Sequence, residues 1–172
     1  MNTHPLSAAA CALFVLVFSE PSPGQDFNQA LDVTGQVFSQ DGPGWRLGGG
    51  AVSHDGTDCV VCETVPGNPS ELTTTIEGPG RLAFWWKLNG GGDADRFQFL
   101  ATSEAGLPVT WLSGAPPPLQ GLTQWRREEL RLPPGPVRIS WRVTSSALPV
   151  AELVPGAFLD ELTWTQESET IP

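Results

Sequence analysis

The 172-residue sequence has few basic side chains, and beyond its first 24 residues it has no long apolar run. Nine Lys and Arg stand against 19 Asp and Glu, which gives a formal net charge of −10. Nucleic acids and anionic lipid surfaces are bound through basic faces, so this balance argues against both as partners. A membrane-spanning helix needs about 20 consecutive apolar residues, so we expect no membrane insertion of the mature chain.

Histidine is also scarce, because His54 is the only one beyond the first 24 residues. Ser53, His54 and Asp55 are the three residue types of a Ser-His-Asp hydrolase triad, but known triads are assembled from distant parts of a chain. Carboxylates are plentiful, yet their spacing singles out no pair suited to glycoside hydrolysis. The sequence therefore favours a protein without catalytic activity, with a jelly-roll glycoside hydrolase or lyase as an alternative.

Cysteine is rare, and only two cysteines lie outside the N-terminal apolar run. Cys59 and Cys62 have the spacing of a redox motif. Redox catalysis needs the first thiolate at a helix N-terminus, whereas the apolar, β-branched residues around this pair predict a strand. In a secreted protein, a short-range disulfide between Cys59 and Cys62 is the favoured interpretation, and two free buried thiols are the alternative.

The first 24 residues are typical of a secretory signal. Ala8 to Phe18 is an unbroken apolar run, too short to span a bilayer but of the length of a signal-peptide core. Small residues at Ser22 and Gly24 precede a plausible cleavage position before Gln25. We therefore expect a secreted extracellular or periplasmic protein with a signal at 1–24, one domain at 25–165 and a polar tail at 166–172.

The sequence is rich in turn-forming residues, with 19 Gly and 17 Pro. Between the turns lie short segments in which apolar residues recur at every second position. After the turn signal Gly78-Pro79-Gly80, large apolar residues recur at every second position, which is strand periodicity. These residues are Leu82, Phe84, Trp86 and Leu88. Trp85 makes the opposite face partly apolar too, so we expect this strand at the centre of the fold, in a sheet covered on both sides.

Comparable segments recur along the chain, and none shows convincing helical periodicity. The expected strands lie near 31–37, 59–65, 72–76, 95–101, 109–113, 123–132, 137–143 and 158–164. The charged residues at 126–129 are expected in solvent. About eight to ten short strands predict an all-β fold, namely an antiparallel β-sandwich or jelly roll.

Several motifs follow one another in an order that is informative as a whole. They are H-D-G-x-D at 54–58, G-P-G-x-L-x-F-W-W-K at 78–87, D-x-F-x-F at 95–99, I-S-W-R at 139–142 and F-L-D-E-L at 158–162. This order resembles bacterial extracellular jelly-roll modules related to MAM domains, which are concanavalin-like sandwiches. The resemblance covers about residues 31–164. It implies a secreted binding or adhesion module whose partner is an extracellular glycan or protein.

The resemblance also implies a structural calcium ion, held by acids from the first strand, an early loop and the last strand. The counterparts here are Asp32, Asp55 or Asp58, and Asp160. Asp160 has an argument of its own, because alternation places it on the face of the last strand that carries Phe158, Leu162 and Trp164. A carboxylate there must be hydrogen-bonded, paired with an arginine or bound to metal.

Seven tryptophans are further candidates for function, because their rings can stack on sugars. Expected in the core are Trp86, Trp141 and Trp164. Trp45, Trp111 and Trp125 lie near strand starts or loops, and they are the candidates for an exposed ligand-binding platform. A carbohydrate-binding module that uses these exposed tryptophans is therefore the first alternative to the adhesion module.

Overall fold

The computed structural model describes residues 26–63, 67–90, 92, 94–112, 114–145 and 156–167. The expected signal at 1–24 lies outside these residues. The one helix within them is α1 (Phe27–Ala30), and no helix there is long and apolar enough to cross a membrane. The strands are β1 (Ser39–Asp41), β2 (Trp45–Gly49), β3 (Asp58–Cys62), β4 (Ser70–Asn89), β5 (Arg96–Ser103), β6 (Thr110–Trp111), β7 (Leu119–Gln120), β8 (Arg126–Thr144) and β9 (Gly156–Gln166). All strand pairs are antiparallel, which confirms the expected fold class.

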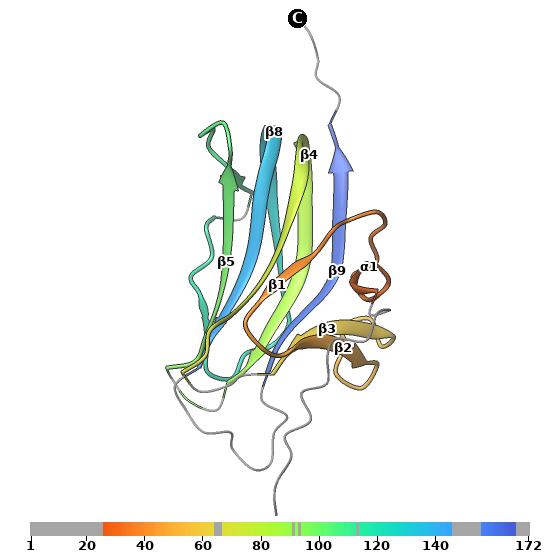
Figure 1. Ribbon diagram of the computed structural model, residues 1–172, viewed down its shortest axis with the longest axis vertical. Helices are drawn as coiled ribbons and strands as arrows, with labels where there is room; N and C mark the ends of the chain where they lie inside the picture. Colours follow the sequence, from red (N-terminus) through yellow and green to blue (C-terminus); the bar gives the residue numbers. More distant parts are fainter. Residues whose placement is uncertain are drawn as a thin grey trace, which may run out of the picture.

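Two long strands contribute to both layers of the sandwich. β4 and β8 pair along most of their length, from Ser70 opposite Val143 to Trp86 opposite Arg126. Both strands run to one end of the molecule, bend over and return in the opposite layer (Figure 1). One layer joins the first half of β4 and the second half of β8 to β1 and β5. The other layer joins the remaining halves to β9 and β6, and β3 and β2 extend it beyond β9.

The bend in β4 depends on the turn Gly78-Pro79-Gly80, whose first peptide bond is cis. A Cβ atom at Gly78 would overlap the carbonyl oxygen of Pro133 in β8, and one at Gly80 would overlap the indole of Trp164 in β9. Glycine is needed at both positions because the neighbouring strands approach too closely for a side chain.

The core lies between the two layers and is built from the alternating residues of β4 and β8. The apolar face predicted after the turn is confirmed, because its four residues Leu82, Phe84, Trp86 and Leu88 are fully buried. Trp141 of β8 packs edge-on against Phe84, with 5.5 Å between the ring centroids. Because β4 and β8 contribute most of the largest fully buried side chains, these two bent strands form the centre of the fold.

The N-terminal part of the domain differs from the expectation. Residues 31–37 were expected to form the first strand, but α1 ends at Ala30, Asp32 has a positive φ of 57° and β1 begins only at Ser39. Leu31 is nevertheless fully buried, and its carbonyl oxygen accepts a 2.9 Å hydrogen bond from the amide of Leu162. The burial of Leu31 and this backbone hydrogen bond to β9 therefore hold the segment, although it forms no regular strand.

The C-terminal end of the sheet also extends slightly further than expected. β9 continues to Gln166, where the polar tail was expected to begin. The amide of Glu167 donates to the carbonyl oxygen of Pro79 at 3.0 Å, and the Glu167 carboxylate pairs with Arg81 and Arg131. These contacts keep both residues at the sheet, and residues 168–172 lie outside the described ranges.

Candidate functional site

The outer face of the layer formed by β9, β4 and β8 carries a group of partly exposed rings. Trp85 and Lys87 project from β4 onto this face, opposite the core-facing Trp86. Trp125 directly precedes β8, and its ring centroid lies 5.9 Å from Nζ of Lys87. His54 reaches the same face from the loop before β3. We refer to His54, Trp85, Lys87 and Trp125 as the aromatic patch.

His54 connects the members of the aromatic patch. Its imidazole stacks on the indole of Trp85, with centroids 3.8 Å apart and an interplanar angle of 18°. It meets the ring of Trp125 edge-on at 5.6 Å. Its Nδ1 lies 2.6 Å from Oε2 of Glu161, and its side chain is 28% exposed. His54 is therefore held between two indoles and a carboxylate, stacked on one ring and edge-on to the other.

Asp160 anchors the loop that carries His54. Its carboxylate accepts hydrogen bonds from the amide of His54 at 2.6 Å and from the amide of Glu161 at 2.8 Å. The Asp160 residue is only 1% exposed, and burial raises its pKa to about 6 although both backbone bonds act in the opposite direction. The side chain thus serves as a backbone acceptor. Arg81 and Arg142, the two arginines that could have paired with it, form no ion pair with Asp160 among the described residues.

A bulge in β9 corrects the expected orientation of Asp160. Glu161 has a positive φ of 48°, and the register between β9 and β4 shifts between Ala83 and Trp85. One extra residue reverses the faces of a strand. Phe158 and Asp160 therefore face outward beside Lys87 and Trp85, whereas Leu162 packs in the main core. The alternation expected through 158–164 is wrong at this point.

The acids expected to bind calcium lie near one another. The pKa of Asp32 is raised by partial burial and by the negative charges of Asp55, Asp58 and Glu161. Asp160 is already occupied by two backbone amides. In the part of the chain that the structure describes, no three His, Cys, Asp or Glu residues are placed to hold a metal ion. Calcium binding by these acids therefore stays a prediction of the resemblance.

The three tryptophans proposed as a platform have different surroundings. Trp45 is 4% exposed and packs against Phe97 in the core, so its place in an exposed platform is wrong. Trp111 is half-buried and packs edge-on against Phe99. Trp125 is half-buried in the aromatic patch. Sequence analysis missed Trp85, although its alternation with Trp86 and its position before Lys87 indicate an outward face.

The two cysteines of β3 are free thiols, which corrects the expected disulfide. In an extended strand, side chains three positions apart point to opposite faces and cannot meet. Burial raises the pKa of Cys59 and of Cys62 to about 12, so both are protonated and unreactive in the folded protein. The alternative of two free buried thiols is confirmed.

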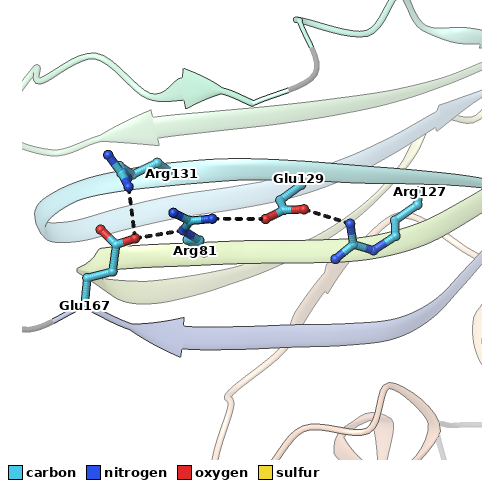
Figure 2. A network of polar contacts seen from close by, with 5 residues as sticks. All are labelled: Arg81, Arg127, Glu129, Arg131 and Glu167. Atoms are coloured by element: carbon cyan, nitrogen blue, oxygen red, sulfur yellow. Dashed lines mark hydrogen bonds and ion pairs between the residues drawn. The ribbon is translucent and has the colours of Figure 1, made fainter.

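An ion-pair network joins β4, β8 and the end of β9 (Figure 2). Because outward residues of a strand alternate, Arg81 lies on the same outer face as Trp85 and Lys87. Arg81 of β4 contacts Glu129 and Glu167, which in turn contact Arg127 and Arg131. The side chains are 29% to 48% exposed, and pairs of this kind contribute little stability. Their main consequence is to place three guanidinium groups and two carboxylates on the face of the sheet.

Glu128 departs from the expectation that residues 126–129 are solvated. It is only 1% exposed, on the inward face of β8. Its Oε1 accepts a 3.1 Å hydrogen bond from Nε1 of Trp86 and lies 2.6 Å from Nε of Arg126. Burial raises the pKa of this carboxyl group. Glu128 therefore has a structural role in satisfying a buried indole.

Comparison with known proteins identifies an architecture and no family. No protein-family model and no curated protein matches the sequence. The chain is similar to the carbohydrate-binding module TmCBM61, solved in complex with β-1,4-galactotriose, with a TM-score of 0.55 and 15% identity over 83% of this chain and 95% of that one. It is similar to the secreted serine protease VesC from Vibrio cholerae, with a TM-score of 0.54 and 15% identity over 81% of this chain and 26% of that one.

The relation to MAM domains is not confirmed by these comparisons, whereas the sandwich architecture is. At 15% identity the likeness to either structure concerns the fold. The chain is therefore an antiparallel β-sandwich, an architecture that it shares with TmCBM61 and with part of VesC.

Proposed function

We propose that this chain is a secreted, non-catalytic glycan-binding module whose ligand binds at the aromatic patch. The observation that carries the proposal is the presence of the half-buried indoles of Trp85 and Trp125 on an outer sheet face, next to His54 and Lys87. Indole rings offer an apolar surface to the C–H face of a sugar, while neighbouring polar groups can bond its hydroxyls.

The architecture supports a carbohydrate over other extracellular ligands. TmCBM61, a module in complex with β-1,4-galactotriose, shares the sandwich over 95% of its own chain. The position of the patch is an independent support, because its rings are held by His54, Glu161 and Asp160 from separate strands and loops. A preorganised site loses less conformational entropy when a ligand binds.

Lack of catalysis is part of the proposal. A catalytic carboxyl group must be able to contact the substrate. The three buried carboxylates among the described residues instead each accept a hydrogen bond from the protein. These are Asp95 with Ser145, Glu128 with Trp86, and Asp160 with the amide of His54. The alternative, a hydrolase or lyase, predicts new reducing ends or unsaturated products when the protein is incubated with polysaccharides; either product would contradict the proposal.

The test of binding is titration calorimetry with the glycans that a glycan array identifies, in calcium and in chelator. Trp125→Ala should weaken binding by about tenfold or more, as expected for an aromatic residue at the centre of a binding site. Trp111→Ala is the matched control, because it also removes an indole but lies against Phe99 away from the patch. Silence of the wild-type protein on the array, or equal loss in both folded variants, would contradict the proposal.

A further inference from the structure

Unlike Arg81, Arg127 and Arg131, Lys87 has no acidic partner in the part of the chain that the structure describes. Its Nζ lies 5.9 Å from the ring centroid of Trp125 and 5.6 Å from that of Phe158. Among the described residues it forms no ion pair, whereas Arg81, Arg127 and Arg131 all do. Cation–π contacts hold the ammonium group in place without neutralising it. Lys87 is therefore positioned with its charge available to a ligand.

The outer face is less acidic than the chain as a whole. Four of the nine basic residues, Arg81, Lys87, Arg127 and Arg131, share it with four carboxylates, those of Glu129, Glu167, Asp160 and Glu161. These eight groups sum to a formal charge of zero, in a chain whose formal charge is −10. An anion is therefore repelled less at this face than at the remaining surface.

The cations and rings follow one line along β4. Strand geometry separates neighbouring outward residues by about 7 Å, so Lys87 and Arg81 are about 20 Å apart along the strand. Trp85 and the small Ala83 lie between them on the same face. An extended chain ligand along β4 would thus meet the ammonium group of Lys87, then the imidazole of His54 stacked on Trp85, and then the ion-pair network of Figure 2.

We infer that the aromatic patch selects anionic saccharides, with a sugar carboxylate or sulfate group against Lys87 and the adjoining sugar ring against the indoles. This inference rests on the proposed function and names the class of its ligand. The ammonium group between two rings, which forms no ion pair among the described residues, carries it, on a face that is less acidic than the rest of the chain.

The experiment measures the affinity of the full chain for polygalacturonate, dextran sulfate and neutral β-1,4-galactan. In about 50 mM NaCl, at least one anionic polymer should bind about tenfold more tightly than galactan, and about 500 mM NaCl should reduce that difference through screening. Lys87→Met should remove the preference, so that the anionic polymer binds no more tightly than galactan. Arg142→Met is the matched control, because this exposed arginine lies on the other layer.

The two anionic polymers identify which charged group is recognised. Preference for polygalacturonate indicates a carboxylate, and preference for dextran sulfate indicates a sulfate. Equal binding of an anionic polymer by the wild type and Lys87→Met, or tighter wild-type binding to galactan than to both anionic polymers, would overturn the inference. In those cases, loss of galactan binding in Trp125→Ala would still uphold the proposed function, whereas no binding to any glycan would contradict both.

Discussion

The imidazole of His54 lies flat on the indole of Trp85, with ring centroids 3.8 Å apart. This contact joins the loop before β3 to the outer face of β4. Asp160 holds the same loop through the amide of His54, and Glu161 contacts the imidazole directly. The proposed binding surface is therefore assembled from one loop and two strands, which are distant in sequence.

Replacing His54 by alanine should loosen this assembly. The variant loses the ring stack and the contact with Glu161, so we expect the free energy of unfolding to fall by about 1–2 kcal/mol. Trp85 should also become more accessible to acrylamide, which fluorescence quenching measures. His54→Phe is the control, because it retains the stacked ring and should restore most of the stability. Unchanged quenching in His54→Ala would show that the stack does not shield Trp85.

Asp160 should make the folded state relatively more stable at mildly acidic pH. Its pKa is raised from 3.8 to about 6 by burial, so in this interval the folded protein binds more protons than the unfolded chain. The contribution of Asp160 to stability is therefore complete below about pH 4 and is lost as the pH rises through about 6. In thermal melts, the melting temperature of the wild type should rise relative to that of Asp160→Asn as the pH is lowered from about 7 to about 5. A constant difference between the two proteins would contradict this linkage.

Two adjacent glutamates of β8 should differ sharply in their importance. Glu128→Ala leaves the buried Nε1 of Trp86 and the Arg126 guanidinium without their partner, so we expect a loss of about 3–5 kcal/mol. Glu129→Ala removes partly exposed ion pairs and should cost less than about 1 kcal/mol. Urea denaturation of both variants measures the difference. Similar midpoints would mean that Glu128 is solvated.

The thiols of Cys59 and Cys62 should be unreactive until the protein unfolds. Both are buried, and burial raises the pKa of each to about 12. A thiol reagent such as Ellman's reagent should therefore label neither cysteine in the native protein and both in denaturant. Failure of both to react in denaturant without a reductant would indicate a disulfide, and rapid labelling of the native protein would indicate an open site.

Much of the fold could be predicted from local patterns. The turn at Gly78-Pro79-Gly80 and the alternation that follows it identified the central strand and its buried face, because burial on one face of a strand has a period of two residues. Local patterns could not show that β4 bends at this turn and enters a second layer. That bend depends on contacts with Pro133 and Trp164, which are distant in sequence.

By itself, the sequence determined the all-β class, the acidic character, the apolar face of the central strand and the candidacy of Trp125. Tertiary structure decided that Trp45 is buried, that Trp85 belongs to the outer surface and that a bulge at Glu161 turns Asp160 away from the core. The physical reason is that alternation assigns side chains to one of two faces of a strand. Which face meets solvent, and which loop covers it, depends on the packing of segments far apart in the chain.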